Sequence, residues 1–119
     1  MSTYREMIER VDEARPNSFS ENLKLKWLQE LNGKIAADVF LLGIEEIRAM
    51  EGKYPEGMEH KPLVSFPHED IYELWLRAKI DFANDEMDRY QNTMALYNEA
   101  YTNFVSWFVS NYEPAQGFL

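Results

Sequence analysis

The chain has 119 residues, of which 45% are hydrophobic and 28% charged, with a net charge of −9 and no cysteine. This composition is typical of one folded, soluble domain. The absence of cysteine excludes disulfides and thiolate chemistry, and no apolar run is long enough to span a membrane. The negative charge also disfavours direct binding to nucleic acid or to an anionic membrane.

The first two predicted helices begin at capping boxes. Thr3 pairs with Glu6, and the apolar face that follows ends before Pro16. Ser18 and Glu21 form a second capping box ahead of a longer apolar stripe. We expect one long helix from about Ser20 to Met50 that includes two glycines, Gly33 and Gly43.

Residues 51–67 break every periodicity and predict a long loop, a kind of segment that is often functional. A third helix follows Pro67. On its surface we expect a solvated i, i+4 ladder formed by Glu73, Arg77 and Asp81. Asn84 is expected to end this helix in a left-handed conformation, and Asp85 to cap the next.

The last predicted helix carries an a/d heptad seam and runs to about Tyr112, ending at Pro114. Its seam consists of Met87, Tyr90, Met94, Tyr97, Tyr101, Phe104 and Phe108. Because tyrosine needs a partner for its hydroxyl, we expect the seam at the edge of a core or against another subunit. The opposite flank carries Leu96, Ala100 and Trp107. The predicted fold is all-α, a four-helix bundle-like single domain over residues 1–119 with a long loop between helices two and three.

The chain shows no motif for phosphate binding, zinc proteolysis or serine hydrolysis. His60 and His68 could join Glu69 or Asp70 at a metal, but exposed or capping histidines explain them better. We therefore predict no catalytic, metal or cofactor site and no enzymatic activity. A small enzyme or metal–carboxylate bundle stays the least favoured interpretation.

Two stretches carry a resemblance to a family: 27–33 (Trp-Leu-Gln-Glu-Leu-Asn-Gly) and a pattern of apolar and turn residues between Pro67 and Tyr101. They resemble small head–tail connector, or neck, proteins of tailed phages and prophages of Gram-positive bacteria. The resemblance covers about 75 residues and contains no catalytic signature. It leaves out the first predicted helix.

The resemblance implies a virion structural protein that assembles as a homo-oligomer, often a ring, between the portal and the tail-side neck proteins. Its location would be the virion, and the host cytoplasm during assembly. An acidic wall would let DNA pass without holding it. The alternative is a prophage-encoded cytoplasmic interaction module, a regulator or inhibitor that docks through an acidic surface.

Apolar residues in the long loop and on the last helix are the candidate contacts to a neighbouring subunit or the portal. We expect the loop to be partly mobile in the isolated chain and to become ordered on assembly. The candidate contact residues are Tyr54, Met58, Leu63, Val64, Phe66, Tyr97, Tyr101 and Trp107.

Overall fold

A computed structural model describes residues 2–116 of the chain, with side chains to Asn111. Over these residues it contains five α-helices, one 3-10 turn and no strand, so the predicted all-α class is confirmed. The elements are α1 (Tyr4–Ala14), α2 (Glu21–Asp38), α3 (Ile44–Ala49), the 3-10 turn η1 (Glu56–Glu59), α4 (Asp70–Ala83) and α5 (Met87–Gln116).

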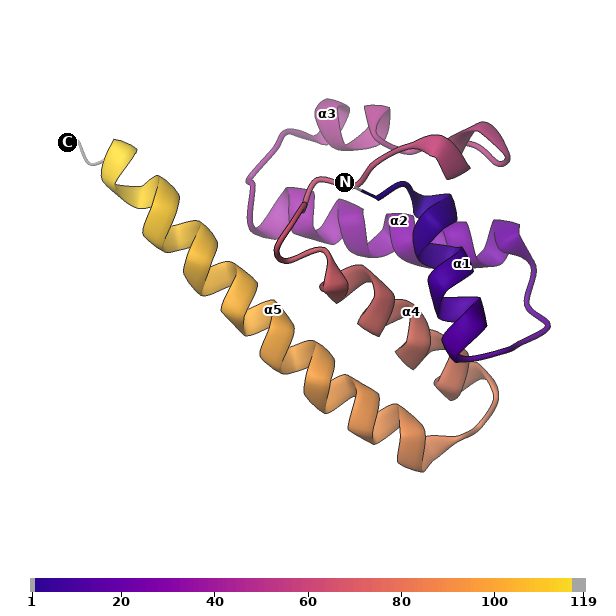
Figure 1. The fold of residues 1–119 in the computed structure, drawn as a ribbon. Coiled ribbons are helices and arrows are strands. Elements are labelled where there is room, and N and C mark those ends of the chain that lie inside the picture. The colour runs from indigo at the N-terminus through magenta and orange to yellow at the C-terminus, as the bar shows by residue number, and fades with distance from the viewer. Residues whose placement is uncertain (1, 117–119) are drawn as a thin grey trace.

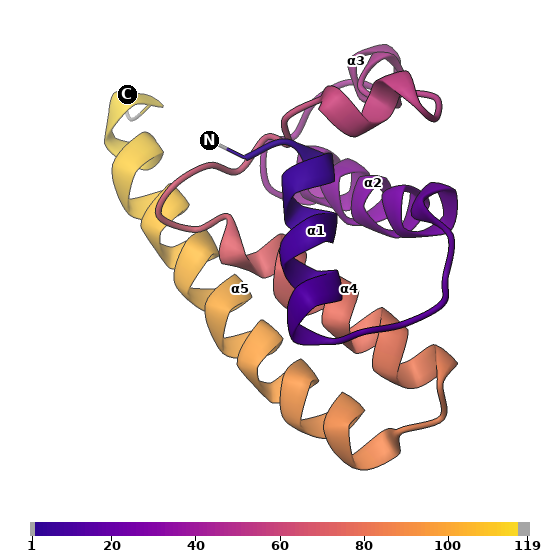
Figure 2. The same cartoon turned by 45° about the vertical axis from the view of Figure 1, so that its right-hand side comes forward.

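α4 is the centre of the molecule. It packs antiparallel against α5 on one side and against α1 and α2 on the other (Figure 1). With 30 residues, α5 is about 45 Å long, close to the longest dimension of the molecule, 51 Å. Turning the molecule shows that the C-terminal turns of α5 extend beyond the other helices (Figure 2).

α1 begins at the predicted capping box and buries the face that the sequence indicated. The hydroxyl of Thr3 accepts the Glu6 N–H, and the Glu6 carboxylate accepts the Thr3 N–H in return. The buried side chains of this helix are Tyr4, Met7, Ile8 and Val11.

The prediction of a solvated ladder on α4 is wrong. The acidic residues of that ladder pair with arginines of α1 and of its C-terminal end instead. Arg10 pairs with Glu73 at 2.8 Å, and Arg15 pairs with Asp81. Asp81 is fully buried and also accepts a hydrogen bond from Thr93 of α5. These contacts join the first helix to the α4–α5 pair.

The prediction of one long helix from about Ser20 to Met50 is also wrong, because this segment forms two helices joined by a corner. α2 is capped by Ser20, not Ser18, and ends at Asp38. Leu41 then adopts a left-handed backbone conformation, with a φ of 57°. α3 begins after Gly43, whose N–H donates to the Glu46 carboxylate. At the corner, the Phe40 ring packs against the Phe108 ring of α5.

The end of the long loop, which we expected to be partly mobile in the isolated chain, makes hydrogen bonds to two helices of the same chain. The Tyr72 hydroxyl donates to the Asn32 side chain at 2.7 Å and accepts the Val64 N–H at 3.1 Å. The same Asn32 oxygen accepts the Leu63 N–H. The loop therefore bridges α2 and α4 through a buried polar network.

The turn between α4 and α5 uses a different residue from the one predicted. Asp85, with a φ of 59°, takes the left-handed conformation, whereas Asn84 does not, with a φ of −91°. α5 begins at Met87 and continues to Gln116, past the expected end near Tyr112 and Pro114.

Candidate protein-interaction surface

The middle of α5 carries almost no charge on its exposed surface. Between Tyr90 and Asn111 the only Asp, Glu, Lys or Arg is Glu99, although most of these residues are exposed. Neutral polar and apolar side chains occupy the other exposed positions. Because the centres of protein interfaces are depleted of charged residues, this composition is typical of a helix that contacts another protein.

The inner face of α5 forms part of the core. Phe104 is 1% exposed and Tyr97 8%, and the Tyr97 ring lies 5.4 Å from that of Trp75 in α4. Burial raises the pKa of Tyr97 to about 12. Burial, with a smaller effect of the Asp38 carboxylate, raises the pKa of Tyr101. The heptad seam thus packs mainly within this chain, and its first residue, Met87, is exposed.

A groove runs between the start of α4 and the middle of α5. It has a volume of about 280 Å³ and is lined on α4 by Leu74 and on α5 by Leu96. Leu96 is 54% exposed. The His68 ring lies 5.0 Å from that of Trp107, which is partly exposed, and so extends the apolar surface. The lining residues are Pro67, His68, Asp70, Leu74, Leu96, Glu99, Ala100 and Asn103. Below, "the α4–α5 groove" means these residues together with Trp107.

A second apolar surface lies at the corner between α2 and α3, here called the 39–44 corner. Its sequence, Val-Phe-Leu-Leu-Gly-Ile, has no charged residue. Leu41 is 78% exposed and Ile44 65%. The left-handed conformation costs a residue such as leucine about 1–2 kcal/mol. The backbone of the corner is held by the Leu42 N–H, which donates to the Ala36 carbonyl at 2.9 Å, whereas the Leu41 side chain is mostly in solvent.

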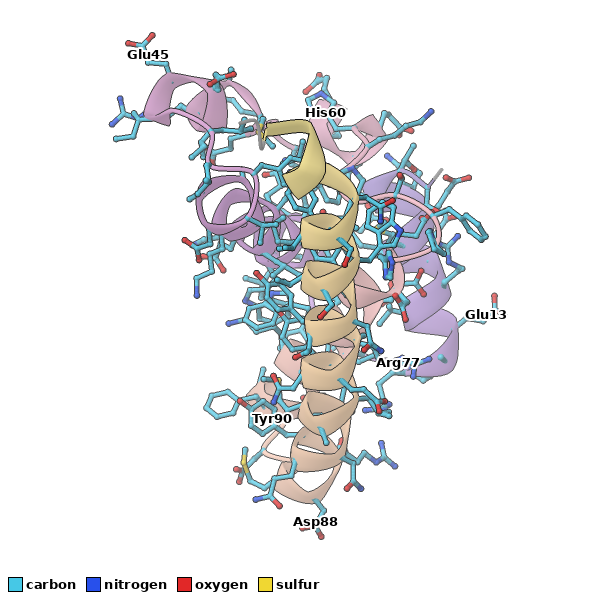
Figure 3. The ribbon with its side chains drawn as sticks, turned by 90° about the vertical axis from the view of Figure 1, so that its left-hand side faces the viewer. Glu13, Glu45, His60, Arg77, Asp88 and Tyr90 are labelled. Carbon is cyan, nitrogen blue, oxygen red and sulfur yellow. The ribbon has the colours of Figure 1, made fainter. Side chains whose placement is uncertain are left out.

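A third exposed apolar pair, Phe82 and Met87, lies at the turn between α4 and α5. The Phe82 ring packs 5.2 Å from that of Tyr90. Asp85, Glu86 and Asp88 are beside this turn, and Glu86 pairs with Arg89 at 3.3 Å. Tyr90 and Asp88 mark this end of the molecule in Figure 3.

The structure separates the contact residues predicted from the sequence into buried and accessible ones. Met58 and Val64 are 0% and 4% exposed, so they belong to this chain's core and offer no surface to a partner. Tyr97 is also buried. Tyr101 and Leu63 are half-buried. The exposed members of the set are Tyr54, Phe66 and Trp107.

Tyr54 has a partner within the chain, because its hydroxyl donates to the Glu21 carboxylate at 2.9 Å. Phe66 precedes the first residue of the α4–α5 groove and is 81% exposed. The prediction from the sequence placed Leu41 and Ile44 within a helix and did not identify them as exposed contact residues. Four consecutive apolar residues, Val39 to Leu42, were the available signal, since one buried helix face cannot cover them all.

Over the described residues there is no group of three or more His, Asp or Glu side chains that could hold a metal ion. The His60 backbone carbonyl accepts the Tyr4 N–H, and the ring of His68 packs on Phe104 and Trp107. Within the same residues, no helix is both long and apolar enough to cross a membrane.

Comparison with known proteins identifies no relative: no family model, curated protein or solved structure matches the chain significantly. The site is therefore interpreted from its own geometry and from the resemblance described above.

Proposed function

We propose that the chain is a phage virion structural protein of the head–tail connector type, which assembles between the portal and the tail around the DNA channel. The observation that carries the proposal is the α4–α5 groove. The segment with the resemblance, from Pro67 to Tyr101, contains α4 and the first half of α5 and contributes most of the groove. An assembly protein requires accessible apolar contacts, and this groove offers Leu96 and Trp107.

The charge of the chain also supports this proposal. With 21 Asp and Glu against 12 Lys and Arg, the protomer repels duplex DNA instead of holding it. A conduit through which DNA must slide benefits from that repulsion.

The direct test adds the purified chain to portal-containing heads that lack it and images them by electron microscopy. We expect additional density at the portal vertex. The double variant Leu96→Glu/Trp107→Glu places two charges at the α4–α5 groove, and we expect it to be excluded. Phe82→Gln, at the far end of α4, is the matched control and should be incorporated like the parent. Absence of the parent protein from the portal vertex would contradict the proposal.

The acidic turn with Phe82 and Met87 favours a second candidate, a cytoplasmic interaction module that docks through this end. An apolar pair bordered by Asp85, Glu86 and Asp88 suits a basic partner surface. In that case Phe82→Gln, and not the groove variant, would abolish binding to the partner, and the chain would not associate with portals.

A further inference from the structure

α3 leaves open space between itself and the body of the molecule. None of its six residues is buried, and it lies with η1 on the side of α2 opposite to α4 (Figures 1 and 2). One cavity of about 310 Å³ lies between α2 and α3. A second, of about 420 Å³, lies between the end of α3, the start of α1 and residues 59–63. Asn32 and Met50 line both, so the two adjoin there and are called the Asn32 cavities below.

The polar network around Asn32 fixes the orientation of its side-chain amide. The Tyr72 hydroxyl accepts the Val64 N–H, so its own proton is donated to Asn32 at 2.7 Å. The Leu63 N–H donates to the same Asn32 atom at 3.0 Å. An atom that accepts from two donors is the amide oxygen, Oδ1, and the other atom is therefore the NH₂ group, Nδ2.

The Asn32 side chain, only 4% exposed, presents Nδ2 to the cavities. Nδ2 has no acceptor among the described residues, although every enclosed side-chain polar atom there has a partner. Nδ2 is therefore not enclosed, and the open spaces that Asn32 lines are the two cavities. A nearly buried donor of this kind gains free energy when a ligand brings it an acceptor oxygen.

The charges around the Asn32 cavities balance, although the whole chain carries a net charge of −9. Arg5, which pairs with Glu59, is itself balanced by Glu21. The less exposed part of the lining is uncharged and includes Met50 and Leu63. A cation or an anion would therefore gain little here, whereas an uncharged ligand would lose little on leaving water. The exposed charged residues of the two linings are Lys26, Arg48 and Lys61 against Glu30, Glu51 and Glu59.

We propose that the Asn32 cavities bind a small uncharged molecule that carries a carbonyl oxygen on an apolar body. The carbonyl oxygen accepts a hydrogen bond from Asn32 Nδ2, and the apolar body packs against Met50, which lines both cavities. Their volumes are in the range of small-ligand sites. The inference goes beyond the connector proposal and is independent of it, because the α4–α5 groove shares no residue with these cavities.

The test is an NMR titration of the isolated chain with cyclohexanone, a probe that consists of one carbonyl group on an apolar ring. The signals to follow are the side-chain amide of Asn32 and the methyl group of Met50. Both should shift and reach saturation, with a Kd of about 1–10 mM for a probe of this size. Cyclohexanecarboxylate and cyclohexylammonium have the same ring with a charge, and each should bind about 10-fold more weakly.

Asn32→Asp replaces the NH₂ donor with an acceptor oxygen and keeps the oxygen that accepts from Tyr72 and Leu63. The Met50 signal of this variant should respond to cyclohexylammonium more strongly than to cyclohexanone, a reversal of preference that a merely structural role would not produce. Asn22→Asp makes the same change at an exposed position of α2 outside both linings, and it should bind like the parent. Met50→Trp fills the junction of the cavities without changing Asn32, and should abolish cyclohexanone binding even if Asn32→Asp does not fold.

Three outcomes would overturn the inference. If the Asn32 and Met50 signals of the parent do not move with cyclohexanone, the cavities hold water only. If the three probes bind equally well, the site does not select an uncharged carbonyl group. If the folded Met50→Trp variant binds cyclohexanone like the parent, the ligand lies elsewhere. None of these results depends on a portal, so the connector proposal and this site stand or fall separately.

Discussion

At the scale of single residues, two glycines make the fold of the long loop possible. A Cβ on Gly57 would lie 2.6 Å from the carbonyl oxygen of Gly52, and one on Gly52 would lie 2.8 Å from the Cα of Gly57. Because both obstacles are backbone atoms, neither can move without displacing the loop. We expect Gly57→Ala to lower the free energy of unfolding by about 1–3 kcal/mol, measured by urea denaturation.

Gly33→Ala is the control, and we expect it to change the free energy of unfolding in the opposite direction. It lies within α2, and the nearest atom to its added Cβ is Ile47 Cγ2 at 3.9 Å, an ordinary contact distance. Gly33→Ala should therefore raise the free energy of unfolding by about 0.5–1 kcal/mol. Equal stabilities of the Gly57→Ala variant and the parent would show that the close backbone approach is not required.

Buried tyrosines predict a loss of stability at alkaline pH. Burial raises the pKa of Tyr4 and of Tyr72 well above the ordinary value of 10.0. Since the folded state keeps these protons when the unfolded state loses them, stability is fully present below pH 10 and decreases as the pH rises above it. Urea denaturation between pH 8 and about pH 11 should show this decline.

Tyr4→Phe isolates the titration, because it removes the ionisable hydroxyl and keeps the buried ring. The variant should lose stability less steeply with pH above pH 10 than the parent. An unchanged slope would mean that Tyr4 ionises with the same pKa in the folded and unfolded states.

At the scale of elements, the ion pair between Arg15 and Asp81 fastens the end of α1 to the α4–α5 pair. Asp81 is fully buried, and its other partner is the Thr93 hydroxyl at 3.3 Å. Arg15→Met leaves this carboxylate without a countercharge, and we expect a loss of about 3–5 kcal/mol in the free energy of unfolding. Adding Asp81→Asn should recover part of that loss, because the uncompensated charge is removed.

Arg77→Met is the matched control for this prediction. Arg77 is on the same helix as Asp81 but has no ion pair within the described residues. Its replacement should change the free energy of unfolding by less than about 1 kcal/mol. If Arg15→Met behaves like Arg77→Met, the ion pair does not hold α1 in place.

At the scale of the whole molecule, the charge predicts that duplex DNA does not bind. A net charge of −9 gives no favourable release of counterions from the phosphates. In a mobility-shift titration at physiological salt, free DNA should persist at micromolar protein. A shift that disappears as salt is added would reveal a basic surface and contradict this prediction.

The sequence by itself determined the helical class, the start of α1 and the core face of α5, because caps and apolar periodicity act within a few residues. It also determined the net charge. Only the tertiary structure decided where α2 ends, because the corner at Leu41 brings Phe40 into contact with Phe108, which is far away in the chain. Likewise Met58 and Asp81 are buried by distant elements, which no local pattern encodes. The α4–α5 groove and the 39–44 corner are surfaces of the packed helices, so the positions of their residues on the molecule follow from the fold.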